Sequence, residues 1–100
     1  MDKTENQIRI VLDEKTASGE YANFANIIHS PSEFVIDFGR IMPGRPEARI
    51  ASRVIMTPQH AKQFLDAIGR NVALYEQKYG TIVLHAQPPI VVVDEGEPSN

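Results

Sequence analysis

The chain has 100 residues, with 10 Lys plus Arg against 13 Asp plus Glu, 42% hydrophobic residues and no cysteine. This length fits one domain that assembles at most one modest core, so self-association is an option from the start. The lack of cysteine excludes disulfides, thiol nucleophiles and thiolate metal sites. The first residues are polar, and no apolar run approaches the ~20 residues of a membrane span. We therefore expect a cytoplasmic protein without a membrane segment.

The net charge of −3 conceals an uneven distribution of charge along the chain. Residues 1–20 hold 3 basic and 5 acidic side chains, and residues 81–100 hold none and 3. The segment 21–80 holds 7 basic and 5 acidic side chains, and five of the seven are arginines: Arg40, Arg45, Arg49, Arg53 and Arg70. Arginine binds phosphate or carboxylate with two parallel hydrogen bonds. A net charge of +2 over these residues is nevertheless small for a nucleic-acid-binding protein.

Four segments have the period-two alternation of β-strands. They are Ile8–Leu12, Tyr21–Ile28, Phe34–Met42 and Ala48–Met56. Turn residues at 29–33 and 43–46 separate the last three, because proline fixes φ and serine bonds to the nearby backbone. One face of the resulting sheet is expected to meet a helix through these apolar residues: Phe24, Ile28, Phe34, Ile36, Phe38, Ile50 and Val54.

A long helix is predicted after the last of these strands. Thr57 is a suitable N-cap and Pro58 a suitable first helical residue, while Gly80 ends the pattern. Apolar residues at spacings of three and four form one stripe: Ala61, Phe64, Leu65, Ile68, Val72, Tyr75 and Tyr79. A helix of 22 residues is ~33 Å long, which exceeds what a small sheet covers. We expect part of the stripe to contact a second copy.

The sequence thus predicts an α+β fold, an antiparallel β-meander of about four strands packed against one long C-terminal amphipathic helix. Residues 1–80 form the single domain and residues 81–100 a C-terminal extension. Within the extension, residues 81–86 are a candidate strand, and the β-branched run 90–93 is expected to pair with this molecule or a neighbour. The acidic residues 94–100 are expected to be disordered.

Asp37 lies in an otherwise apolar strand, where an unpaired carboxylate is unfavourable. If the loop 43–46 closes a hairpin, Asp37 lies across from Arg53, and Ile41 from Arg49. The first interpretation is a structural charge pair that helps to fix the register. The alternative is a row of Arg45, Arg49 and Arg53 that binds phosphates or an acidic peptide. This row lacks the interleaved aromatic residues of a single-strand binder.

The second face of the predicted sheet is only half polar. Its apolar members suggest packing against another subunit, with an apolar centre and charged pairs. The candidate oligomer interface consists of Tyr21, Ile27, Val35, Ile41 and Ile55. The alternative is a monomer that leaves these residues exposed.

No constellation for catalysis is present. The histidines, His29, His60 and His85, stand alone, with no second ligand at a metal-binding spacing. The glycines are isolated, so no phosphate-binding loop is formed. We expect no enzyme activity, no metal and no cofactor.

The segments GEYANFANIIHSPSEFVIDFGRIMPG, RVIMTPQHAKQFLDAIGRN and YEQKYG resemble a family of small bacterial and archaeal proteins, catalogued as domain of unknown function 3467. The resemblance spans residues 8–80. Its most specific parts are Tyr21, Asn23, the turn His29-Ser30-Pro31, the strand 34–38 with Asp37, and residues 57–62. It implies a strand meander followed by one helix and a prokaryotic or phage origin. It implies no activity, substrate or catalytic residue.

Three hypotheses for function follow. The first is a non-enzymatic, homo-oligomeric interaction module, most simply a dimer, with an unknown protein partner as an option. The second, ranked below it, is a nucleic-acid-binding accessory protein that uses the arginine row. The third is a small chaperone or adaptor, since a meander followed by a long helix is similar in outline to the SecB-like export chaperones, whose sequence motifs are absent here.

Overall fold

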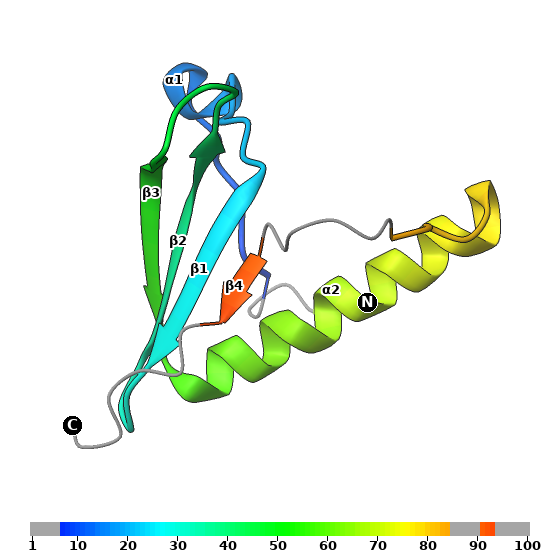
Figure 1. Cartoon of the computed structure of the whole chain (residues 1–100). Helices are drawn as coiled ribbons and strands as arrows, with labels where there is room; N and C mark the ends of the chain where they lie inside the picture. The colour runs from blue at the N-terminus through cyan, green and yellow to red at the C-terminus, as the bar shows by residue number, and fades with distance from the viewer. Residues whose placement is uncertain (1–6, 85–90, 94–100) are drawn as a thin grey trace.

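The computed structural model describes residues 7–84 and, for the backbone alone, residues 91–93. The elements in chain order are α1 (Glu14–Ala17), β1 (Phe24–His29), β2 (Phe34–Ile41), β3 (Ala48–Met56), α2 (Pro58–Tyr79) and β4 (Val91–Val93). Strands β1, β2 and β3 form an antiparallel meander, and the long helix α2 follows it (Figure 1). The α+β fold with an antiparallel sheet and a C-terminal helix is therefore as predicted.

The predicted first strand is wrong. Residues 7–13 form no strand, and Ile8 and Ile10 are almost fully exposed. A strand at this position would have paired with the free edge of β1. That edge pairs with β4, which runs parallel to β1 and gives the sheet order β3-β2-β1-β4. Residues 81–84 are not in a strand either, while residues 85–86 and 94–100 lie outside the described residues.

The face assigned to β1 also needs correction. His29 pairs with Phe34 and Ile27 with Ile36, so Ala25, Ile27 and His29 share the face of Phe34, Ile36 and Phe38. The sequence pattern had placed Phe24 and Ile28 there instead. The cause is the loop between the strands, which is closed by a hydrogen bond from Ser30 N to Glu33 O of 2.9 Å. Because side chains alternate, the loop decides which set of β1 residues faces which side of the sheet.

A β-bulge interrupts the pairing of β2 with β3. Phe38 pairs with Ser52 but Gly39 pairs with Ile50, so β3 has one extra residue, Ala51. As a result Arg40, and not Ile41, lies opposite Arg49, which corrects the expected pairing. Gly39 is needed here, because a Cβ at this position would lie 2.9 Å from Ile50 Cα and closer still to the Arg49 carbonyl group.

We expect Gly39→Ala to lower the free energy of unfolding by roughly 1 to 3 kcal/mol, because the added methyl group meets the backbone of β3. Urea unfolding followed by circular dichroism measures this change. The matched control is Arg40→Ala, an exposed neighbour in the same strand, which should stay within about 0.5 kcal/mol of the wild type. Equal effects of the two substitutions would contradict this role of Gly39.

Local signals define the ends of α2. The Thr57 hydroxyl accepts a hydrogen bond from His60 N at 3.1 Å, which satisfies one free amide of the first turn, and Pro58 is the first helical residue. At the other end, Gly80 has φ of 104°, a conformation that favours glycine. Its amide donates to Glu76 O, and the Glu76 carboxylate accepts from Ile82 N at 2.9 Å. The predicted bounds of the helix are confirmed.

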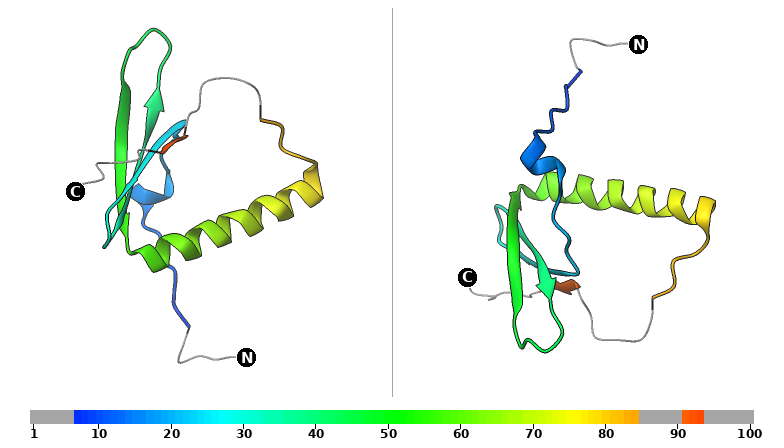
Figure 2. Two further views of the ribbon diagram at one scale, coloured as in Figure 1. Left: turned by 60° about the horizontal axis from the view of Figure 1, so that its bottom comes forward. Right: turned by 90° about the horizontal axis from the view of Figure 1, so that it is seen from above.

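The predicted position of α2 across the sheet is wrong. The helix begins beside the end of β3 and extends beyond the edge of the sheet, so its far end lies away from every strand (Figures 1 and 2). No residue of α2 is buried. Thr57 alone separates β3 from α2, and its backbone is extended, as is usual for an N-cap residue. The expected contacts of the helix with Phe24, Ile28, Phe34, Ile36, Phe38, Ile50 and Val54 therefore do not form along its length; Ile50 and Val54 remain exposed.

Candidate interaction surface

The apolar stripe of α2 is exposed to solvent. Its large side chains have exposed fractions between 41% and 70%: Phe64, Leu65, Ile68, Val72, Tyr75 and Tyr79. Near the C-terminal end of the helix the rings of Tyr75 and Tyr79 lie 4.9 Å apart, and Lys78 Nζ lies 5.4 Å from the Tyr79 ring centre. Isolated exposed apolar residues are ordinary, but a continuous stripe along one helix marks an interaction site.

A shallow hollow adjoins this stripe. It is lined by Phe64, Ala67, Ile68 and Asn71, mostly with apolar surface. These four residues follow one another at i, i+3, i+4 and i+7, and such a set forms the hole that receives one side chain of a facing helix. The hollow is thus suited to helix packing, and it is open to solvent.

The sheet buries little apolar surface of its own. Among the described residues, the buried apolar side chains are Ala25 and Ile36. The five residues of the predicted oligomer interface do not share one face. Val35 pairs with Ile55, and Ile41 follows on the same side, whereas Ile27 pairs with Ile36 on the other side. Tyr21 precedes β1 and is exposed.

Asp37 and Arg53 form a two-bonded ion pair across β2 and β3. Arg53 Nε donates to Asp37 Oδ1 at 2.6 Å, and Nη2 donates to Oδ2 at 2.9 Å. The Asp37 side chain is 7% exposed and the Arg53 side chain 60%. The hydrogen bonds from Arg53 lower the pKa of Asp37; partial desolvation opposes this, and the guanidinium charge adds to it. The same bonds raise the pKa of Arg53.

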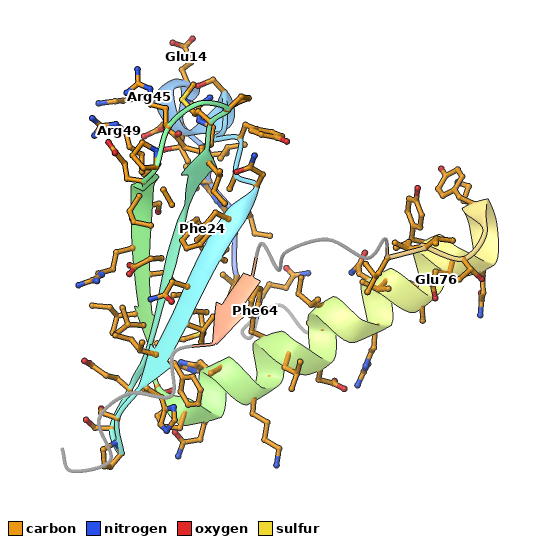
Figure 3. The ribbon with its side chains drawn as sticks, viewed as in Figure 1. Glu14, Phe24, Arg45, Arg49, Phe64 and Glu76 are labelled. Carbon is orange, nitrogen blue, oxygen red and sulfur yellow. The ribbon has the colours of Figure 1, made fainter. Side chains whose placement is uncertain are left out.

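The predicted arginine row is not assembled. Arg53 is engaged with Asp37, while Arg49 lies across from Arg40 near the end of the hairpin, beside the loop that holds Arg45 (Figure 3). The register expected from the sequence did not place Arg40 opposite Arg49, because it did not include the bulge, although a glycine inside a strand can indicate a bulge. Like charges directly opposite each other on neighbouring strands repel weakly.

Asn23 holds the open end of β1 to β2. Its side-chain oxygen accepts from Ile41 N at 2.8 Å, and its side-chain nitrogen donates to Ile41 O at 3.2 Å. The amide group thus continues the ladder of hydrogen bonds beyond Phe24. Asn23 is among the residues that carry the resemblance given above, and this contact gives it a structural role.

The histidines have structural surroundings. The His29 ring stacks on Phe34 at 5.5 Å, the His60 amide donates to the helix cap, and His85 lies outside the described residues. Within residues 7–84 and 91–93, no three His, Cys, Asp or Glu side chains gather to hold a metal ion. Over the same residues, no helix is long and apolar enough to cross a membrane.

Comparison with known proteins assigns the chain to a family. The family model described as protein of unknown function (DUF3467) matches residues 1–84. The chain therefore belongs to this family, as the resemblance predicted. Comparisons with curated proteins and with solved structures found no match.

The ion pair makes stability depend on pH. The pKa of Asp37 is lower in the folded protein than in the unfolded chain, so its stabilising contribution is complete above the unfolded value of about 4. We expect the contribution to decrease as the pH falls from about 4 through the folded pKa, because the unfolded state binds the proton first. Asp37→Asn should remove this part of the pH dependence, as measured by thermal unfolding from pH 2 to pH 7.

The control is Asp66→Asn, which breaks the exposed pair of Asp66 with Arg70, 2.9 Å apart on α2. Exposed pairs of this kind contribute little, so the pH profile of this variant should follow that of the wild type. A profile of Asp37→Asn that coincides with the wild type would show that the ion pair does not contribute.

Proposed function

We propose that the protein is a non-enzymatic, homo-oligomeric interaction module whose basic unit is a dimer. The observation that supports this most strongly is the exposed apolar stripe of α2. Burying a large apolar side chain contributes about 1.5 to 3 kcal/mol, and the six large side chains of the stripe are between 41% and 70% exposed in a single chain. A second copy of the chain is the simplest partner for the stripe, because it presents the same stripe and two-fold symmetry closes the assembly.

The residues of the sheet support the same proposal. With Ala25 and Ile36 as its buried apolar side chains, the described part of one chain has little core of its own. Small domains with such cores commonly gain stability by oligomerisation. The side of the sheet that carries Val35, Ile41 and Ile55 is a further candidate contact within the assembly.

The other two hypotheses have weaker support. The nucleic-acid hypothesis relied on Arg53, which is engaged with Asp37, and the net charge of −3 does not favour binding to phosphates. The chaperone hypothesis rests on outline alone. Neither is favoured by a specific observation on the described residues.

We expect the wild-type chain at micromolar concentration to have at least twice its mass of 11.2 kDa in size-exclusion chromatography with light scattering. Ile68→Asp should weaken self-association by about two orders of magnitude or more, because a carboxylate without a partner is placed in the apolar contact. Since α2 is not buried in one chain, the sheet should remain folded in this variant.

Gln63→Asp is the matched control, because it places the same charge on the helix outside the stripe. It should keep the mass of the wild type. A monomeric wild-type chain at micromolar concentration would refute the proposal, and so would equal masses for Ile68→Asp and the wild type.

A further inference from the structure

The spacing of the stripe on α2 is the heptad spacing of a coiled coil. The residues Ala61, Leu65, Ile68, Val72, Tyr75 and Tyr79 follow one another at intervals of 4, 3, 4, 3 and 4. This is the heptad repeat that keeps one seam facing a partner helix. The positions on the far side of the helix from this seam are polar, namely Gln63, Arg70 and Gln77. A helix that lay across a sheet would not need this strict repeat.

We infer that two copies of the chain pair through α2 in an antiparallel coiled coil, with the two-fold axis crossing the seam at the level of residue 70. This inference rests on the proposed function and specifies the partner and its direction. The occupant of the exposed stripe is α2 of a second copy, and the evidence for its direction is the order of residues along the seam.

In the antiparallel arrangement the seam residues match in size. Ala61 faces Tyr79 of the second copy, Leu65 faces Tyr75, and Ile68 faces Val72, so that all the seam residues of both helices are used. The smallest residue of the seam thus receives the largest. A parallel arrangement in register would place Ala61 against Ala61 and Tyr79 against Tyr79, leaving a gap at one end and crowding at the other.

The residues beside the seam match in charge. On one side Lys62 faces Glu76 of the second copy, twice by symmetry, while Gly69 faces Gly69 and allows close approach. On the other side Asn71 faces Asn71, and Phe64 faces the aliphatic stem of Lys78. Glu76 Oε2 accepts from Ile82 N, and the other carboxylate oxygen is suited to Lys62. A parallel pair brings Asn71 toward Glu76 and no opposite charges together.

The placement of α2 in the fold agrees with this direction. Only the N-terminal end of α2 lies beside the sheet, and the rest extends from it, as the positions of Phe64 and Glu76 along the helix illustrate (Figure 3). An antiparallel pair therefore separates the two sheets by the ~33 Å length of the 22-residue helix. The hollow of Phe64, Ala67, Ile68 and Asn71 lies on one flank of the seam, and Ile68 is its seam residue.

Cysteine cross-linking tests the direction, because the natural chain has no cysteine. Full-length Ala61→Cys and Tyr79→Cys chains, carrying tags of different size, are mixed and oxidised with copper phenanthroline. We expect a disulfide between the two different chains and none within either variant alone. If Ala61→Cys cross-links efficiently to itself, the helices are parallel and the inference is refuted, whereas the proposed dimer stands.

Charge exchange gives a second test that leaves the seam intact. Lys62→Glu alone and Glu76→Lys alone should each dimerise about tenfold more weakly, because two facing pairs become repulsive. An equimolar mixture should form a heterodimer, in which both facing pairs attract. Gln63→Glu and Gln77→Lys, on the far side of the helix, are the controls and should show no preference for each other.

Light scattering on the wild type distinguishes a failure of the proposed function from a failure of the antiparallel arrangement. A monomer refutes the proposed function together with the inference. A dimer whose charge-exchange variants behave like the controls refutes only the antiparallel arrangement.

Discussion

The direction of α2 at Thr57 is the constraint on which the other features depend. Because α2 extends away from the sheet directly after Thr57, the apolar stripe and the sheet do not cover each other within one chain (Figure 2). Two apolar surfaces are then left over, one along α2 and one on the strands. Since folding of small domains relies on apolar burial, the proposed dimer would bury apolar surface that a single chain leaves exposed. In the proposed dimer, burial of the stripe couples the stability of α2 to the concentration of the chain.

The ends of α2 and the extent of β3 could be predicted because their signals are local. Thr57 and Pro58 mark a helix start, Gly80 marks its end, and period-two alternation continues through β3. The position of α2 could not be predicted in this way. An apolar stripe indicates that one side of a helix packs against an apolar surface, but it does not indicate whether that surface belongs to the same chain. The strand predicted at residues 8–12 failed for a related reason, since alternation does not provide a pairing partner.

The faces of the sheet show how a small local feature has distant effects. The loop of residues 30–33 decides that Ile27, and not Ile28, lies beside Ile36, so the candidate interface predicted from alternation mixed two faces. The bulge opposite Gly39 likewise moves Arg49 from Ile41 to Arg40. Asp37 and Arg53 lie on the far side of the bulge from the hairpin loop, where the pairing expected from the sequence holds, whereas on the loop side the pairing is shifted by one residue. The predicted arginine row therefore separates into one residue that is paired and others near the end of the hairpin.

Strand β3 has a consequence for solubility. It is one of the two outer strands of the described sheet and runs for nine residues, from Ala48 to Met56, long enough to act as a template for a strand of a neighbouring molecule. The extra residue Ala51 disturbs the repeat of its free amide and carbonyl groups, and the exposed Arg49 and Arg53 add charge along it. Stacking of sheets edge to edge into fibres is thereby disfavoured.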